Sequence, residues 1–231
     1  MIDSFGHDPR LCNAEIIQIA GCLRSFPRLE GGNLSLYNAE ISAGSLMLPE
    51  SRRIAAFLLT NPDEAAWRQV FSLEENLLQK NKPATARRMG RLIRNRLEGV
   101  SEETLRLIAE GDREVALQLL FACAIKHSRL LGDFLRDIYR ERLRTLEKTL
   151  EPKEWETFLH ECEQRDPTIT AWSESTRKKI FQVIVRILAE AGYLNSTRNL
   201  VLTVPLLHPV VTKHLNSVGW KDMLTVMEIV R

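Results

Sequence analysis

The sequence has few of the residues that interrupt helices or build β-sandwiches. Its 231 residues include 11 Gly and 9 Pro, and aromatic residues make up only 6%. Leu, Ala, Glu and Arg, which have high helix propensities, are plentiful, so the composition favours helix and argues against an all-β sandwich. Charged residues at 27% and hydrophobic residues at 44% are typical of a soluble globular chain and exclude a disordered or fibrous protein.

Paired cysteines and long apolar runs are also absent. Cys12, Cys22, Cys123 and Cys162 form no CxxC pair and have no ligand spacing with the histidines. The sequence therefore indicates neither a zinc site nor a disulfide framework, and a reduced, cytoplasmic setting fits best. The longest uncharged apolar stretch in the middle of the chain, 115–125, is well short of the roughly 20 residues that cross a bilayer, so we expect no membrane span.

Motifs of catalysis and of nucleotide binding are missing as well. The chain contains no GxGxxG, GxxxxGKS or GxxxxGKT sequence, and none of its histidines stands beside a Ser or Cys nucleophile motif. We therefore expect a protein that is not an enzyme and that uses no metal, no cofactor and no small-molecule partner.

An excess of one charge is missing from the whole chain but not from its segments. With 32 Lys and Arg against 30 Asp and Glu, the formal net charge is +2. Segment 82–98 has six basic residues and one acidic residue, a local charge of +5, whereas segment 151–166 is acidic. The near-neutral total is thus a cancellation between segments, and it does not exclude a nucleic-acid partner.

Turn and cap residues divide the chain into four parts, which we expect to form one compact globule. The parts are an N-terminal arm at 1–48, a first helix-turn-helix region at 49–100, a central helical bundle at 101–166 and a C-terminal winged-helix-like region at 167–231. In the last part, a helix that ends at Gly192 precedes two short apolar runs, which predict a minor β-hairpin wing near 193–204. The predicted fold class is all-α, a helical bundle containing two helix-turn-helix or winged-helix-like elements.

Two of the predicted helices begin in a similar way. Aligning Thr85 with Thr176 places Pro83–Met89 on Glu174–Ile180, and in both segments two basic residues precede apolar residues at helical spacing. Helical periodicity alone gives the apolar matches, so it is the shared basic start that favours a duplicated motif.

The charges of these two helices break the ordinary rules for a solvated helix surface. In the first helix Arg87, Arg91 and Arg94 fall on one face without the acidic neighbours that normally pair with them. In the second helix, residues 177–179 place three cations in the first turns, where the helix dipole disfavours each by roughly 0.3–1 kcal/mol. Such departures without evident compensation indicate a functional surface.

Phosphate contact explains both features. The first turns of a recognition helix enter the major groove of DNA, where Arg and Lys reach phosphates and base edges. The residues predicted to contact DNA are Lys82, Thr85, Arg87, Arg88, Arg91, Arg94, Ser175, Thr176, Arg177, Lys178, Lys179 and Arg198. The alternative is a solvated basic surface that pairs with the acidic segment 151–166.

Several short motifs resemble those of one family. They are YNAEISAGSL at 37–46, ESRRIA at 50–55, ATARR at 84–88 and WSESTRKK at 172–179. In these motifs the chain resembles the BrxA family, the small subunit of BREX bacteriophage-exclusion systems, over residues 37–215. The resemblance implies an all-helical protein with two helix-turn-helix elements that binds double-stranded DNA beside other BREX subunits, including a DNA methyltransferase and an ATPase. It implies no catalytic residues.

Two other functions stay open on the sequence. One is a helical adaptor or scaffold subunit whose basic faces bind a protein partner of the defence complex. The other is an RNA-binding helical bundle. The three hypotheses differ in which ligand the isolated protein retains at moderate salt: duplex DNA, another subunit, or structured RNA.

Overall fold

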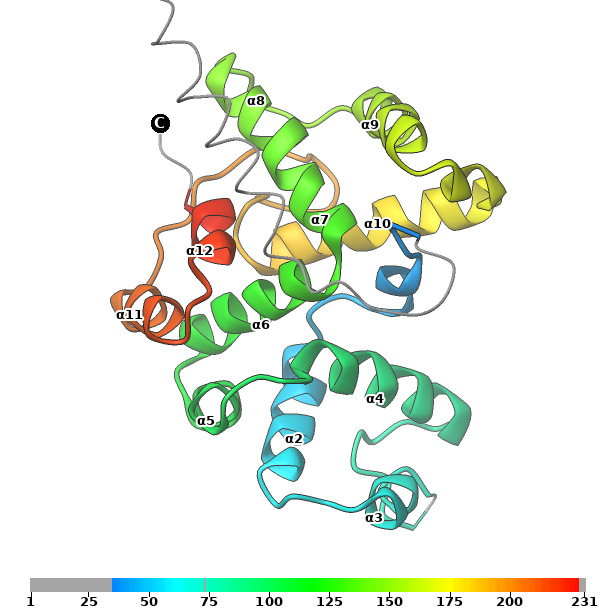
Figure 1. Ribbon diagram of the computed structural model, residues 1–231, viewed down its shortest axis with the longest axis vertical. Coiled ribbons are helices and arrows are strands. Elements are labelled where there is room, and N and C mark those ends of the chain that lie inside the picture. Colours follow the sequence, from blue (N-terminus) through cyan, green and yellow to red (C-terminus); the bar gives the residue numbers. More distant parts are fainter. Residues whose placement is uncertain (1–34, 73, 229–231) are drawn as a thin grey trace, which may run out of the picture. The chain divides into compact units, whose positions relative to one another are not determined.

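Helices dominate residues 35–72 and 74–228, which are the residues described by the structure, a computed structural model. The elements are the 3₁₀-helix η2 (Glu40–Ala43), α2 (Leu48–Leu58), α3 (Glu64–Gln69), α4 (Pro83–Leu97), α5 (Glu102–Glu110), α6 (Arg113–His127), α7 (Arg129–Phe134), the π-helix η3 (Leu135–Tyr139), α8 (Arg140–Arg144), α9 (Pro152–Arg165), the 3₁₀-helix η4 (Pro167–Ala171), α10 (Glu174–Glu190), α11 (Pro209–Ser217) and α12 (Lys221–Met227) (Figure 1). The predicted helical class is confirmed. Most of the predicted N-terminal arm, residues 1–34, lies outside the described residues.

Helix starts are fixed by local capping residues. The side chains of Asp63, Ser101 and Ser173 each accept a hydrogen bond from the backbone N–H three residues later, which satisfies a donor that the helix cannot. Pro83 stands at the start of α4, where its missing N–H costs nothing. At the other end of α10, Gly192 has φ of +81°, the left-handed conformation in which glycine is favoured.

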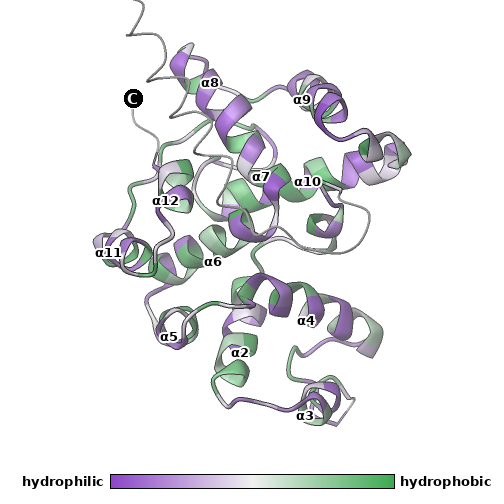
Figure 2. Cartoon of the chain, in the orientation of Figure 1, coloured by the Kyte–Doolittle hydropathy of each residue, from purple (hydrophilic) through white to green (hydrophobic). Residues whose placement is uncertain are grey.

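Helix α6 forms the centre of the hydrophobic core. Its residues Val115, Ala116 and 118–125 are buried, and it packs against α2, α4, α5, α7, α11 and α12. A helix that is apolar on all sides requires such complete cover. Hydrophilic residues predominate instead on α8 and α9 (Figure 2).

The apolar helix α6 raises the question of a membrane span. Within the two described ranges no single helix is both long and apolar enough to cross a bilayer. Helix α6 and the helical run Arg129–Arg144 together have the length and apolar composition of a span, but the chain bends by 107° between them.

The loop after η2 joins α4 to α10 through one buried and one partly buried charge. Arg96 of α4 is 5% exposed, and its guanidinium donates to the carbonyl oxygens of Ser45 at 2.5 Å and Gly44 at 2.9 Å. From α10, the Glu190 carboxylate accepts from Ser45 Oγ at 2.7 Å and from the backbone N–H of Leu46 at 2.8 Å. Burial lowers the pKa of Arg96 to about 10, so it remains a cation at neutral pH.

A second polar anchor fixes the start of the described chain. The Asp166 carboxylate accepts from the backbone N–H of Tyr37 at 2.9 Å, and the Tyr37 hydroxyl donates to Asp133 of α7 at 2.7 Å. Asp133 is 1% exposed, so Tyr37 ties the chain before η2 to the buried side of α7 and to the end of α9.

The predicted hairpin wing near 193–204 does not form as two strands. Residues 193–204 fold back on themselves, but the only pairing between the two sides that amounts to a bridge is Leu194 with Leu202. Backbone N–H groups that a longer ladder needs are used elsewhere. That of Tyr193 donates to the carbonyl of Leu188, and that of Val201 donates to the side-chain oxygen of Asn195 at 3.2 Å.

The two helix-turn-helix elements are not confirmed either. A helix-turn-helix joins its two helices by about 3–4 residues. Here the connection from α3 to α4 takes all of residues 70–82, and α9 is joined to α10 through η4. The helices predicted to recognise DNA are present, but the turns that precede them are not the short turns of that motif.

Arg96 provides a test of the junction between α4 and α10. We expect Arg96→Ala to lower the free energy of unfolding by about 3 kcal/mol, because the buried carbonyl of Ser45 and the partly buried carbonyl of Gly44 lose their donor. The matched control is Arg88→Ala on the same helix, where the side chain is exposed and the expected change is within about 0.5 kcal/mol. Urea denaturation followed by circular dichroism measures both, and equal stability of the two variants would contradict this role.

Candidate nucleic-acid interface

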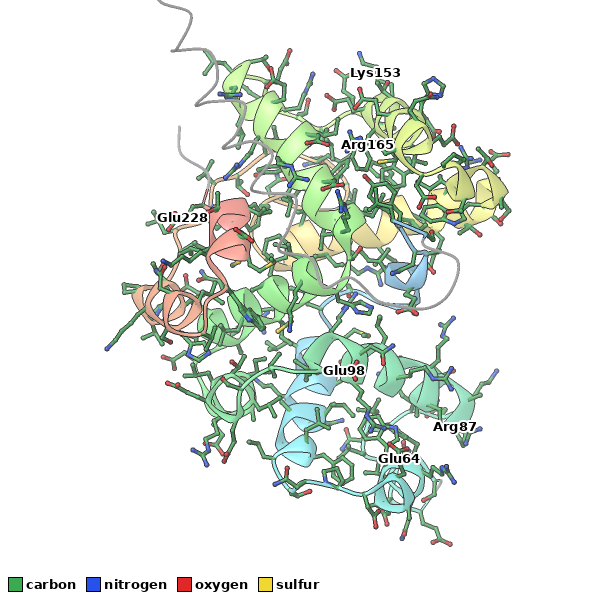
Figure 3. The ribbon with its side chains drawn as sticks, viewed as in Figure 1. Glu64, Arg87, Glu98, Lys153, Arg165 and Glu228 are labelled. Atoms are coloured by element: carbon green, nitrogen blue, oxygen red, sulfur yellow. The ribbon has the colours of Figure 1, made fainter. Side chains whose placement is uncertain are left out.

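The basic face of α4 forms one wall of a cleft, and α3 forms the other. The cleft has a volume of 470 Å³. Its lining residues are Glu64, Trp67, Arg68, Phe71, Arg87, Arg91, Arg94, Asn95 and Glu98. In Figure 3, Glu64 marks the α3 wall and Arg87 and Glu98 mark the two ends of the α4 wall. The predicted arginine face therefore borders a defined concavity.

Arg94 is held in this cleft by two contacts from α3. Its guanidinium carbon lies 4.6 Å from the centre of the Trp67 ring, and its Nη2 lies 2.5 Å from a carboxylate oxygen of Glu64. The hydrogen bond from Arg94 lowers the pKa of Glu64. Trp67 is fixed in turn by edge-to-face contact with Phe71, at 5.0 Å between ring centres. Of the predicted α4 residues, Arg94 is thus the one already engaged by α3.

Four other cations of this segment are exposed and have no ion-pair partner among the residues of known placement. They are Lys82, Arg87, Arg88 and Arg91. Thr85 is half-buried in the first turn of α4, where its N–H donates to the carbonyl of Lys82. Positive charge that no carboxylate neutralises is therefore concentrated in the first turns of α4.

The polar residues at the start of α10 are engaged in capping. Ser173 Oγ lies 2.9 Å from the hydroxyls of both Ser175 and Thr176. Lys178 pairs with Glu174 at 2.5 Å, although both side chains are more than 60% exposed and so contribute little to stability. Lys179 is exposed and has no carboxylate partner in the described part of the chain.

Arg177 points toward the protein interior. Its Nη2 lies 2.5 Å from a carboxylate oxygen of Glu163 on α9, and the guanidinium also donates to the carbonyls of Trp172 and Ile169. The side chains of Arg177 and Glu163 are 24% and 17% exposed. Arg177 is therefore paired with the acidic segment 151–166, which is the alternative to DNA contact that the sequence left open.

The loop after α10 carries Arg198, which is exposed and whose backbone N–H donates to Ser196 Oγ at 3.3 Å. Next to it, Thr197 and Leu200 line a cavity of 230 Å³ together with residues of α10. One of these is Arg186, an exposed cation that no sequence pattern singles out.

The residues that line the α3 wall of the cleft are also not among those predicted from the sequence. A signal is present, because Glu64, Trp67, Arg68 and Phe71 recur at the spacing of one helix face. What the spacing does not reveal is that this face lies opposite the arginines of α4, since the two helices are separated by residues 70–82.

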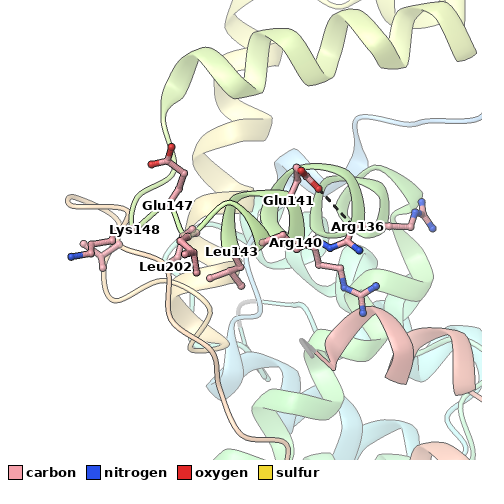
Figure 4. A pocket seen from close by; sticks show the side chains of 10 residues that line it. Arg136, Arg140, Glu141, Leu143, Glu147, Lys148 and Leu202 are labelled. Atoms are coloured by element: carbon pink, nitrogen blue, oxygen red, sulfur yellow. Dashed lines mark ion pairs between the residues drawn. The ribbon is translucent and has the colours of Figure 1, made fainter. Parts of the chain in front are cut away.

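A larger cavity, of 1210 Å³, lies where η3 and α8 meet residues 146–148 and 201–202 (Figure 4). Its charges are mixed, and Arg144 pairs with Glu141 at 3.8 Å. Leu146 on its wall is 86% exposed. An exposed apolar side chain among charges of both signs is typical of a protein contact rather than of a phosphate site. Within the described ranges, no group of three or more His, Cys, Asp or Glu residues could hold a metal ion.

These features define a class of protein: an all-helical protein with unneutralised cations at the starts of two helices. The family model of BrxA matches residues 35–219. The chain therefore belongs to the BrxA family of BREX defence components.

Similar proteins support this assignment. A BREX protein BrxA of Paramagnetospirillum magneticum is 43% identical over 162 residues, which cover 70% of this chain and 81% of the relative. A BREX protein BrxA of Escherichia coli is 33% identical over 189 residues, with 82% and 88% of the two chains covered. The crystal structure of an uncharacterized protein from Magnetospirillum magneticum superposes with a TM-score of 0.78 at 36% identity, covering 84% of this chain and 99% of that one.

The structural role of Arg177 can be separated from a surface role. We expect Arg177→Ala to lower the free energy of unfolding by about 2 kcal/mol, because the half-buried Glu163 loses its partner and two carbonyls lose a donor. Lys179→Ala, two residues further along α10, removes the same charge from an exposed position and is expected to change stability by less than about 0.5 kcal/mol. Thermal unfolding of both variants checks this, and an unchanged midpoint for Arg177→Ala would show that the pair is not structural.

Proposed function

We propose that this chain is a non-enzymatic component of a BREX bacteriophage-defence system that binds double-stranded DNA. The observation that carries the proposal is the set of exposed cations in the first turns of α4, Arg87, Arg88 and Arg91, with no ion-pair partner among the described residues. Ordinary helix surfaces mix charges so that such residues pair with acids three or four positions away. Cations that stay unpaired are available to neutralise phosphates.

The arrangement of α4 and α10 supports a shared DNA surface. Both helices have their N-terminal ends toward the same side of the view in Figure 1. Lys178 and Lys179 of α10, with Arg198 in the following loop, supply the second group of cations. Arg177 is left out of this group, because its pair with Glu163 is mostly covered by the protein, whereas the pair of Lys178 with Glu174 is exposed and leaves the ammonium accessible. The proposed contact uses helix starts, as a helix-turn-helix does, without a strand-built wing.

The salt dependence of duplex binding tests this proposal. Replacing Arg87 and Arg88 together with Ala is expected to weaken binding about tenfold and to reduce the log–log salt slope by about 0.9 for each phosphate that the protein no longer neutralises. The double variant Lys178→Ala and Lys179→Ala is expected to act in the same direction. Fluorescence anisotropy of a labelled duplex at several salt concentrations measures both quantities.

A charge-matched control separates local contacts from overall charge. Replacing the exposed Lys213 of α11 and Lys221 of α12 with Ala removes the same number of cations from other helices. The duplex affinity and the salt slope of this control variant are expected to stay close to those of the unmodified protein. Equal weakening by the control and by the α4 variant would contradict a specific DNA surface, as would unchanged binding in both. Stronger retention of structured RNA than of duplex DNA would favour an RNA-binding protein instead.

A second function, binding of another BREX subunit, is favoured by the cavity beside α8. Leu146 exposes 86% of its surface there, which a protein partner would cover.

This adaptor function predicts that Leu146→Asp reduces co-purification of another subunit of the same system while duplex affinity stays within about twofold. The substituted side chain is exposed, so the fold is expected to be unaffected. Thr145→Asp, an exposed neighbour outside the cavity lining, is the matched control. Unchanged co-purification with Leu146→Asp would exclude this surface as the contact.

A further inference from the structure

The cleft between α3 and α4 has the size of a site for one nucleotide. Its volume of 470 Å³ falls within the range of about 300–1,000 Å³ that is usual for sites of small organic ligands. A DNA duplex does not fit into such a space. The predicted contacts of α4 with duplex DNA therefore leave the interior of the cleft without an assigned ligand.

The cleft contains a flat surface on which a base can stack. The guanidinium of Arg94 lies over the Trp67 ring at 4.6 Å from its centre, and Glu64 fixes its position from the side. The Arg94 side chain is 40% exposed, and both Arg94 and Trp67 line the cavity. Unstacked bases bind on aromatic rings and on the planes of arginine guanidinium groups.

The remaining lining residues change in character along α4. Arg87 and Arg91 come first, and Arg68 of the opposite wall adds a third cation. Asn95 and Glu98 follow about one and two turns after Arg91. Cations suit a phosphate, whereas an amide and a carboxylate suit the hydrogen-bonding edge of a base. The order of groups thus matches the order of groups in a nucleotide.

We propose that this cleft binds a single unpaired nucleotide of DNA, with its phosphate between Arg87 and Arg91 and its base stacked on the Arg94–Trp67 pair. This inference rests on the proposed function, because it extends the duplex-binding surface of α4. Arg87 and Arg91 then hold the phosphate at the junction between the duplex and the unpaired nucleotide, while Lys82 and Arg88, which lie outside the cleft lining, contact the neighbouring duplex. The substrate class is therefore DNA in which a duplex adjoins an unpaired nucleotide, as at an overhang.

Comparison of two DNA probes tests this inference. One is a blunt duplex, and the other is the same duplex with a three-nucleotide overhang that contains the fluorescent base 2-aminopurine. We expect the unmodified protein to bind the overhang probe about tenfold more tightly than the blunt one, since a stacked base contributes on this order. The fluorescence of 2-aminopurine is expected to fall on binding as the base stacks.

Two variants assign the preference to the cleft. Trp67→Leu keeps an apolar side chain but removes the ring, and is expected to abolish both the preference and the fluorescence change while blunt-duplex affinity stays within about twofold. Because Trp67 is half-buried, Arg68→Ala serves as a second variant on an exposed residue, with an expected loss of several-fold in the preference. Arg88→Ala, outside the cleft, is expected to weaken both probes equally and to leave their ratio unchanged.

Each result decides the question. No preference in the unmodified protein, or a preference that survives in both Trp67→Leu and Arg68→Ala, overturns the inference and leaves duplex binding intact. Binding of the overhang probe alone, with no affinity for the blunt duplex, supports the nucleotide site and contradicts the proposed function. A deoxynucleoside monophosphate that competes as strongly as the overhang probe would identify the ligand as a free nucleotide, and so would overturn its assignment to DNA.

Discussion

The arrangement of the two basic helices depends on the peptide segment 44–46, which is held between Arg96 of α4 and Glu190 of α10. The cation donates to the carbonyls of Gly44 and Ser45, and the carboxylate accepts from Ser45 and Leu46. The buried Arg96 and the partly buried Glu190 are thus balanced by polar groups of the loop, and these groups are satisfied in return. Two helices far apart in the sequence are fixed to one another by a loop that precedes both.

Features that depend on neighbouring residues could be predicted from the sequence. The starts of α4 at Pro83 and of α10 after Ser173 follow from proline and cap residues that the sequence itself contains at those positions. The hairpin near 193–204 is predicted from its turn and its apolar runs, which are also local. Its failure to form strands does not follow from that pattern, because the N–H of Tyr193 donates to the carbonyl of Leu188 near the end of α10 and that of Val201 donates to the side chain of Asn195.

Candidate site residues show the same limit. A count of charges includes Arg96 in the basic total of segment 82–98, but the structure buries it, because its partners are the carbonyls of Gly44 and Ser45. Arg94 and Arg177 likewise have carboxylate partners on other helices, Glu64 and Glu163. Sequence shows that a segment is basic. It does not show which of its cations are already neutralised, since that depends on residues brought close only by folding.

The same distinction explains how a chain of nearly neutral total charge can present a basic surface. The acids of α9 are largely used within the protein: Glu154 pairs with Arg142 at 2.8 Å, Glu161 with Arg165 at 3.6 Å and Glu163 with Arg177 at 2.5 Å. Charges paired at such distances give little net field beyond a screening length of about 8 Å at physiological salt. The unpaired cations at the start of α4 are therefore not cancelled by the acidic helix. Attraction of a polyanion is therefore set by these unpaired cations, together with those at the start of α10 and in the loop after it, and not by the total charge.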